Sequence, residues 1–429
     1  MKSTRLMAAE ILLKVVDQGR SLNDELPAAL ADVDLDDQPF LQQLVYGTTR
    51  YYFALDELIR KILDKPVKEK ERIVHMLLAI GLYQLWKLNV AEHAAINETV
   101  SSVNESKRKW ATGLVNASLR RFQREKEELL AQCRRGDSFP GWLNKRLRHA
   151  YPEQYADICA NSNVPGPMSL RVNAKRTTRD AWLALADREG LAVKACDCAM
   201  TAVTLDAPAP VAMLPGFEAG DVSVQDEAAQ LCAQILQLKD GERVLDACSA
   251  PGGKTGHLLE SATNLEMVAL DVSPERLQRV EENLTRIGET AELIAADAAE
   301  IDSWWRGEAF DAILLDAPCS GTGVIRRHPD IKLLRKSADI TALAKIQRNL
   351  LNQLWKTLKP GGRLLYATCS ILPDENSHQI EGFVFDKADA ELVSLTIPAD
   401  ADTAAGIQWL PQPNGHDGFF YALLKKKPA

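Results

Sequence analysis

The stretch Val244-Leu-Asp-Ala-Cys-Ser-Ala-Pro-Gly-Gly-Lys-Thr-Gly-His257 decides how the second half of the chain is expected to fold. Residues 244–247 suit a short buried strand, residues 249–253 break it into a glycine-containing loop, and Leu258 begins an apolar helical pattern. A strand, a glycine loop and a helix form the nucleotide-binding unit of doubly wound α/β folds. There the loop backbone can approach a ligand, and the helix N-terminus favours negative charge.

Glycines alone are weak evidence for a ligand site, because many strand-to-helix turns need glycine for steric reasons. The loop matches neither Gly-x-Gly-x-x-Gly nor Gly-x-x-x-x-Gly-Lys-Ser/Thr, so neither the dinucleotide fingerprint nor a Walker loop is present. The evidence for a ligand site therefore has to come from the strands that follow.

Functional groups stand at the ends of four further predicted strands. Asp271 follows Asp246 by 25 residues, and an acid at that strand end can bind the two hydroxyls of a ribose. Open α/β sheets bind ligands at the C-terminal edge of their strands, so these groups together predict one site. The predicted strands and their groups are 267–272 with Asp271, 291–296 with Asp297, 310–316 with Asp316 and then Cys319, and 363–370 with Cys369.

Three motifs in this half resemble those of S-adenosylmethionine-dependent RNA (cytosine-5) methyltransferases of the NOL/NOP/Sun family. They are Cys-Ser-Ala-Pro-Gly-Gly-Lys at 248–254, Asp-Ala-Pro-Cys-Ser-Gly at 316–321 and Ala-Thr-Cys-Ser at 367–370. The layout of the whole chain resembles the bacterial 16S ribosomal RNA methyltransferases of the Fmu/Sun type. The resemblance implies a C-terminal Rossmann-like class I methyltransferase domain that binds S-adenosylmethionine. The cofactor-binding residues implied are Cys248, Ser249, Ala250, Pro251, Gly252, Gly253 and Lys254, with Asp271 at the ribose, Asp297 at the adenine amino group and Asp316 nearby.

Methylation at carbon 5 of cytosine requires a thiolate, because that carbon is a poor nucleophile. Addition of a thiolate to carbon 6 makes carbon 5 enamine-like, so it can attack a sulfonium methyl before a base removes its proton. Cys319 and Cys369 are the two candidates. The resemblance implies that Cys369 attacks and Cys319 assists release. It also implies that Asp316 bonds the cytosine or lies beside the cofactor, and that Lys254 orients the site electrostatically.

The charge of the chain is unevenly distributed. The net charge is −8, but residues 101–150 contain twelve Lys or Arg against five Asp or Glu. Residues 151–429 contain 27 basic and 39 acidic residues. A basic face around Arg120, Arg121 and Arg124 is compatible with docking on an RNA backbone, and equally with a solvated helix face.

The first third of the chain is predicted to be an all-helical bundle. Apolar residues recur at helical spacing behind Ser3, a plausible helix cap, and residues 73–86 are apolar almost all round, as expected at a bundle centre. Short signals at 45–47, 81–85 and 93–98 resemble the RNA-binding antitermination factor NusB. The predicted domains are a NusB-like RNA-binding domain at 1–138, a small α+β subdomain at 139–222 and the methyltransferase domain at 223–429.

Within the small subdomain, five polar residues crowd one part of the sequence, and the resemblance implies that this subdomain packs against the catalytic sheet and helps to grip RNA. The alternative is a solvated surface. They are Arg171, Asn173, Lys175, Arg176 and Arg179.

The C-terminal region is predicted to hold a helix at 338–358 that stops at 359–362, and a helix at 374–385. A final hairpin is predicted from strands at 391–397 and 418–424.

Composition places the protein among globular, cytoplasmic proteins. The tract 73–86 is shorter than the roughly 20 residues of a membrane span, and the first residues lack a signal-peptide core. Eight scattered cysteines suggest reduced thiols. Cys196 and Cys198 have no second ligand pair at metal-binding spacing, so no metal site is predicted. The expected partner is 16S ribosomal RNA, free or partly assembled, bound by a monomer without membrane contact.

Three other functions stay open at this point. A nicotinamide-dependent oxidoreductase would share the acid at Asp271, but it lacks the glycine fingerprint and leaves both cysteines unexplained. A non-catalytic RNA-binding or assembly protein would not need the two cysteines. The same chemistry on another RNA, such as transfer RNA, is not separated by the catalytic motifs. Only the NusB-like region favours the ribosomal type, whose implied target is cytosine 967 of 16S rRNA.

Overall fold

The computed structural model describes residues 2–401 and 403–428, and the chain divides into two compact units. The first comprises Met1–His149, Glu153–Val164 and Ile325–Lys336, and the second comprises Ala150–Pro152, Pro165–Val324 and Ser337–Ala429. The three domains predicted from the sequence, with limits after 138 and 222, stay a prediction.

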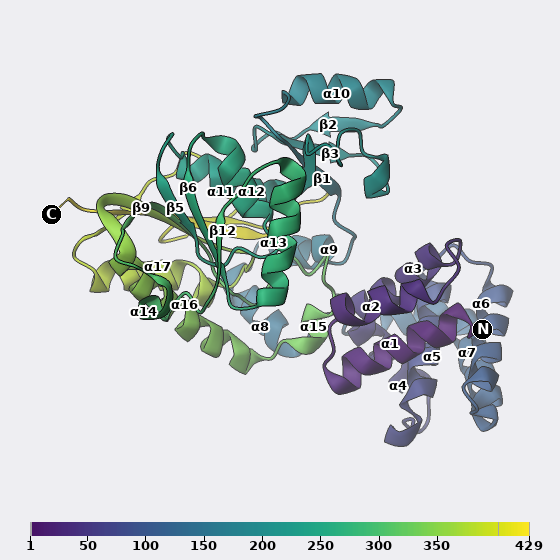
Figure 1. The fold of residues 1–429 in the computed structure, drawn as a ribbon. Coiled ribbons are helices and arrows are strands. Elements are labelled where there is room, and N and C mark those ends of the chain that lie inside the picture. The colour runs from purple at the N-terminus through teal and green to yellow at the C-terminus, as the bar shows by residue number, and fades with distance from the viewer. Residues whose placement is uncertain (1, 402, 429) are drawn as a thin grey trace. The chain divides into compact units, whose positions relative to one another are not determined.

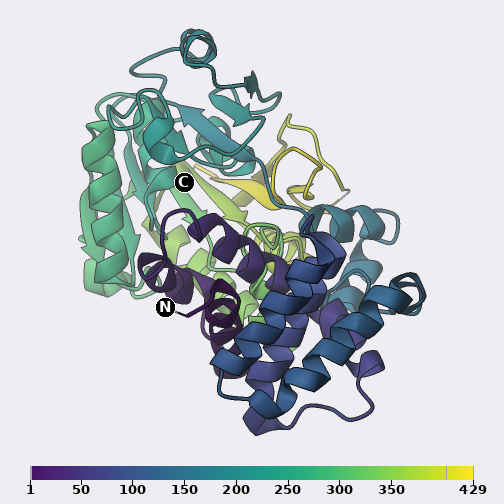
Figure 2. The same cartoon turned by 90° about the vertical axis from the view of Figure 1, so that its right-hand side faces the viewer.

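The first unit is a helical bundle, and its helices before residue 165 are drawn in purple to blue in Figure 2. Ser3 caps its first helix, because its Oγ accepts a hydrogen bond from Leu6 N, as predicted. Residues 73–85 of α5 are all buried, which confirms the predicted centre of the bundle. The helices are α1 (Thr4–Gln18), α2 (Leu22–Ala31), α3 (Gln38–Arg50), α4 (Tyr52–Ile62), α5 (Arg72–Lys87), α6 (Glu92–Glu105), α7 (Thr112–Ala131), α8 (Gly141–Ala150), α9 (Tyr155–Ser162) and the short α15 (Ile331–Leu334).

Segment 325–336, which carries α15, completes this bundle although it comes from the middle of the predicted methyltransferase domain. Lys332 is only 1% exposed, and its Nζ donates to the carbonyl of Arg50 and to Asn163 Oδ1. Arg50 donates to the carbonyl of Arg326 at 2.8 Å, and Asp330 accepts from Leu22 N at 3.0 Å. Burial and the nearby Arg50 hold the pKa of Lys332 well below its ordinary value. No sequence pattern predicted that residues 325–336, from the second half of the chain, would belong to the first unit.

The second unit contains a small antiparallel sheet in the order β2-β3-β1-β4. Its elements are β1 (Met168–Val172), α10 (Arg179–Arg188), β2 (Val193–Ala195), β3 (Ala202–Leu205) and β4 (Val222–Val224). Arg171 and Asn173 are each 2% exposed, which excludes the solvated surface for these two residues, and RNA binding by the subdomain stays a prediction. Arg171 instead forms an ion pair with Glu260 at 2.7 Å and donates to the carbonyl of Gly253 at 2.6 Å.

The larger sheet of this unit has the order β10-β12-β9-β8-β5-β6-β7, with β11 paired to β12. The ladder from β9 to β7 is parallel, whereas β12 pairs antiparallel with β9 and β10. This arrangement confirms the Rossmann-like fold predicted for the second half. The strands are β5 (Arg243–Asp246), β6 (Glu266–Asp271), β7 (Glu292–Ala295), β8 (Phe310–Asp316), β9 (Leu358–Thr368), β10 (Ala390–Val393), β11 (Ile407–Trp409) and β12 (Phe419–Lys426).

Helices cover both faces of this sheet, as Figure 1 shows. Two buried apolar clusters, one on each face, form the core between helices and strands. On one face are α11 (Glu227–Leu236), α12 (Gly253–Ser261) and α13 (Pro274–Ile287), and on the other are α14 (Ile301–Trp304), α16 (Ser337–Thr357) and α17 (Ser377–Asp386).

The predicted end of the long helix is confirmed, because α16 ends at Thr357, directly before 359–362. The following strand starts earlier than predicted, because β9 begins at Leu358 and a register shift against Phe310 and Ala312 accommodates the extra residues. The two predicted last strands do pair antiparallel as β10 and β12, but the prediction missed β11, which lies between them in the chain and also pairs with β12.

Among the described residues, 2–401 and 403–428, no helix is both long and apolar enough to cross a membrane.

Candidate active site

The glycine loop between β5 and α12 is held by backbone packing. Ser249 N donates to the carbonyl of Leu270, and Gly252 N donates to the carbonyl of Ser249. Gly252 has a φ of +96°, and a Cβ there would lie 3.0 Å from the Cα of Val280 in α13. Glycine is therefore required here so that the loop can pack closely against α13. This steric requirement is not by itself evidence of a ligand.

Two buried oxygens beside the loop lack a hydrogen-bond partner among the described residues: Asp246 Oδ1 and Ser249 Oγ. The other oxygen of Asp246 accepts from Thr255 Oγ1 at 2.7 Å, and the side chain is fully buried. Burial raises the pKa of Asp246 to about 7. Buried polar atoms without partners are rare in folded proteins, so this pair indicates a place where a polar ligand can complete the bonding.

Asp271 ends β6, at the position predicted for a ribose-binding acid. It is 5% exposed, and its oxygens accept from Ala250 N at 3.3 Å, from Ser273 N at 3.1 Å and from Arg276 at 3.2 Å. A carboxylate offers about four lone-pair sites, so at least one remains for a ligand hydroxyl. Asp297, after β7, is exposed and uses one oxygen to bond Ala299 N at 2.9 Å.

Lys254 and Asp316 form an ion pair that joins the glycine loop to the end of β8. Lys254 Nζ lies 2.7 Å from Asp316 Oδ2, and the two side chains are 17% and 27% exposed. Burial disfavours the ammonium charge, but Asp316, Cys232 and Cys369 together raise the pKa of Lys254 above its ordinary value. Lys254 therefore stays positively charged within the electrostatic reach of Cys369.

The two predicted reactive cysteines lie side by side. Cys319 Sγ and Cys369 Sγ are 3.4 Å apart, in the loop after β8 and at the end of β9. The hydrogen bond to Cys369, burial, and the negative charges of Cys369 and Glu375 raise the pKa of Cys319 well above its ordinary value. The raised pKa keeps Cys319 protonated, and either sulfur can donate the hydrogen bond between the two thiols.

A buried hydrogen-bonded network adjoins the thiols, and no sequence pattern predicted it. Its members are Ser320, Thr322, Gln347, Ser370 and Glu375, each at most 1% exposed. The one available signal was that each reactive cysteine is followed by serine, at 319–320 and 369–370.

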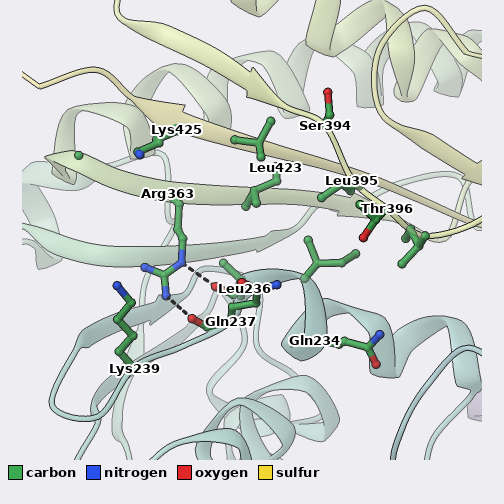
Figure 3. Close-up of a pocket in the computed structure, with 14 residues that line it drawn as sticks. Gln234, Leu236, Gln237, Lys239, Arg363, Ser394, Leu395, Thr396, Leu423 and Lys425 are labelled. Carbon is green, nitrogen blue, oxygen red and sulfur yellow. Dashed lines mark hydrogen bonds between the residues drawn. The ribbon is translucent and has the colours of Figure 1, made fainter.

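A cavity of about 500 Å³ lies elsewhere in the second unit and contains none of the predicted site residues (Figure 3). Arg363 is the central cation of its lining. Its guanidinium donates to the carbonyls of Leu236 at 2.6 Å and Gln237 at 3.0 Å, and it pairs with Glu242 at 2.7 Å. These bonds already occupy the guanidinium, and the cavity shares no residue with the strand edge that carries the predicted site.

The predicted basic face in the first unit is partly neutralised. Arg121 on α7 pairs with Glu125 at 2.9 Å and also donates to the carbonyl of Ile62 at 2.9 Å, and Arg120 donates to Gln123. Arg124 is exposed. Its role in RNA binding stays a prediction.

Comparison with known families divides the chain into three matches. Residues 2–124 match the NusB family, residues 139–212 match a ferredoxin-like domain of the RsmF/B-like type, and residues 233–425 match the family described as 16S rRNA methyltransferase RsmB/F.

Full-length relatives have the same organisation. The chain is 50% identical to ribosomal RNA small subunit methyltransferase B of Pseudomonas putida and 47% identical to that of Escherichia coli, with 99% of each chain covered. Among solved structures, PH0851 is 24% identical with a TM-score of 0.81 over 99% of both chains. A methyltransferase homolog from Pyrococcus horikoshii is 27% identical with a TM-score of 0.60, covering 68% of this chain and 96% of its own.

Proposed function

The chain belongs to the ribosomal RNA small subunit methyltransferase B family, and from this premise we propose that it methylates carbon 5 of a cytosine in 16S rRNA. The methyl donor in this proposal is S-adenosylmethionine. The observation that carries the chemistry is the pair of thiols 3.4 Å apart, because only a nucleophile that adds to carbon 6 makes carbon 5 reactive.

We assign the attack to Cys369. The resemblance of residues 367–370 to the family motif supports this assignment, and so does the geometry: Cys319 lies within hydrogen-bond distance of Cys369, and the ammonium of Lys254 lies within its electrostatic reach. The thiolate adds to carbon 6 of a cytosine that is single-stranded or flipped out of its stack.

The same electrostatics give Cys319 a role in the second half of the reaction. The bond to Cys369 is the largest cause of the raised pKa of Cys319, and the charge of Cys369 is a further cause. Once Cys369 has attacked, both causes disappear, so Cys319 can give up its thiol proton to solvent water. The Cys319 thiolate then takes the carbon 5 proton, and the electron pair of that C–H bond re-forms the ring double bond as Cys369 leaves as a thiolate.

The residues at the glycine loop fit a cofactor with several polar groups. Asp246 Oδ1 and Ser249 Oγ are buried without partners in the described chain, and Asp271 retains a free lone pair. We propose that residues 248–254, Asp271, Asp297 and Asp316 hold S-adenosylmethionine. When bound there, the cofactor supplies an electrophilic sulfonium methyl group. Lys254 and Asp316 connect this loop to the thiols, so they orient the two halves of the site.

We further propose that the target is cytosine 967 of 16S rRNA, free or partly assembled, and that a cytoplasmic monomer performs the reaction. The NusB match over residues 2–124 supports a ribosomal substrate over transfer RNA. The eight cysteines are all free thiols, as expected of a reducing compartment.

The decisive experiment is methylation of unmodified 16S rRNA with radiolabelled S-adenosylmethionine, followed by mapping of the modified base. We expect label at carbon 5 of a single cytosine, and none with Cys369→Ala. Unmodified transfer RNA serves as the competing substrate. Label on transfer RNA alone would replace the ribosomal target, and no label on any RNA would favour a non-catalytic RNA-binding protein.

A further inference from the structure

One carboxylate contacts both of the cysteine–serine pairs at the active site. Ser320 Oγ and Ser370 Oγ each donate to Glu375 Oε2 at 2.6 Å, and Ser320 N donates to Glu375 Oε1 at 2.8 Å. Ser320 directly follows Cys319, and Ser370 directly follows Cys369. The two thiols come from different strand ends, and Glu375 joins the serines beside them at 2.6 Å, closer than the 3.3 Å between the two hydroxyls themselves or the 3.1–3.2 Å contacts with Thr322.

Glu375 is 0% exposed and has no ion pair with Lys, Arg or His within residues 2–401 and 403–428. Gln347 Nε2 donates to its Oε1 at 3.1 Å, and Tyr366 donates to its carbonyl oxygen at 2.6 Å. A buried carboxylate without a cation is costly, and an apolar side chain would generally serve stability better. Its position therefore points to a role in holding the residues around the two thiols in place.

We propose that Glu375 is a positioning residue that sets the spacing of Cys319 and Cys369 through the hydroxyls of Ser320 and Ser370. The inference rests on the proposed function, because it explains the spacing of the two thiols on which that function depends. A thiol displaced by about 1 Å from its reacting geometry can cost about 10²-fold in rate.

The test is Glu375→Gln in the full chain, which keeps the shape of the side chain but removes its charge and part of its accepting capacity. We expect kcat for 16S rRNA to fall by about 10- to 100-fold. The KM values for RNA and for S-adenosylmethionine should stay within about twofold, because no substrate-binding group has changed.

A second readout follows the spacing of the thiols directly. The oxidant diamide takes up two hydrogen atoms as the Cys319–Cys369 disulfide forms, and peptide mass spectrometry measures the rate. The rate should fall in Glu375→Gln, because the two cysteine–serine pairs lose their common anchor. This readout does not depend on RNA, so it decides the inference even if 16S rRNA is not the substrate.

Two control proteins separate positioning from general stability. Glu227 is also buried, at 7% exposed, and accepts from the backbone N–H groups of Cys198 and Ala199. Glu227→Gln should change neither kcat nor the diamide rate. The double variant Ser320→Ala/Ser370→Ala should reproduce the loss seen in Glu375→Gln, and combining all three substitutions should add little further loss.

Wild-type kcat and diamide rate in a folded Glu375→Gln would overturn the inference and leave the proposed function intact. A loss that matches the fraction of unfolded protein, and that Glu227→Gln shares, would overturn it as well. Absence of methylation by the wild-type protein would instead refute the proposed function, while the diamide rates would still decide the role of Glu375.

Discussion

At the thiol end of the active site, Ser320, Ser370 and Glu375 hydrogen-bond one another, whereas at the loop end Asp246 Oδ1 and Ser249 Oγ are buried without partners in the described chain. Both ends lie on the same edge of one sheet. A satisfied network rigidifies the groups it contains, and an unsatisfied buried oxygen gains free energy when a ligand bonds to it. The chain alone thus organises the thiol end, and under the proposed function the cofactor would complete the loop end.

The largest expected effect is on methylation. It tests whether the two thiols have different roles although one hydrogen-bonded network adjoins both. Cys369→Ala should lose methylation by about 10⁴-fold or more and form no adduct with RNA, because the nucleophile is gone. Cys319→Ala should still attack but release slowly, so a covalent protein–RNA adduct should accumulate. Denaturing electrophoresis of labelled RNA measures both.

Adduct from Cys369→Ala and none from Cys319→Ala would exchange the roles of the two cysteines. No adduct from either variant would contradict the proposed role of Cys319 in release.

The next effect concerns the support of the loop end. Arg171 and Glu260 are each 2% exposed as side chains, and Arg171 also bonds the carbonyl of Gly253 in the loop. Arg171→Met should lower the free energy of unfolding by about 3–5 kcal/mol, because Glu260 is left as an unpaired buried charge. Urea unfolding measures the change.

Arg171→Met combined with Glu260→Leu should recover much of the lost stability, because no buried charge is then left unpaired. Equal stability of the single and double variants would show that the loop is not supported through this pair.

Asp246 should make the ligand-free protein less stable as the pH rises. Its pKa is raised from 3.8 to about 7 in the folded state, so the folded protein binds the proton more tightly than the unfolded chain. The contribution of this proton to the free energy of unfolding has its full value below about pH 4. It decreases as the pH rises to about 7, and above that pH it no longer changes. Asp246→Asn should remove a difference of about 2–4 kcal/mol between pH 4 and pH 8.

Thermal unfolding across this pH range measures the effect, with Asp302→Asn as a matched exposed control. An identical pH profile for wild type and Asp246→Asn would mean that the buried carboxyl does not titrate in this range. The loop end would then be less accessible to a ligand than its unpartnered oxygens indicate.

The smallest expected effect is on cofactor affinity. Asp271→Ala should weaken binding of S-adenosylmethionine by about 1–3 kcal/mol, the usual scale for one buried hydrogen bond with a charged partner. Calorimetry on the full chain gives the affinity. The same loss should not occur in Glu375→Gln, which alters only the thiol end. Unchanged affinity in Asp271→Ala would exclude the ribose role.

The strand edge was predictable because it depends on local patterns. Asp271, Asp316 and Cys369 each follow an apolar run of strand length, and parallel strands bring their carboxyl ends to one edge. The central helix at 73–86 was predictable for a similar reason, since a helix that is apolar all round must be buried.

The supporting residues were not predictable, because their partners are distant in the sequence. Arg171 lies 89 residues from Glu260, and Asn173, Lys175 and Arg176 follow it closely, so local composition left a solvated surface open. Glu375 follows Asp374, and nothing in the period of that segment distinguishes a buried acid from an exposed one. Burial of a charge depends on tertiary partners, which periodicity does not encode.

The placement of segment 325–336 in the helical bundle has a consequence for synthesis. Lys332 bonds the carbonyl of Arg50, 282 residues earlier in the chain, so the bundle lacks this partner when its own helices leave the ribosome. At 5–20 residues per second, translation supplies Lys332 roughly 15–60 s after Arg50. During that time the groups of the nascent bundle that pack against α15 stay exposed to solvent. The last contacts of the bundle form only when most of the protein has been made.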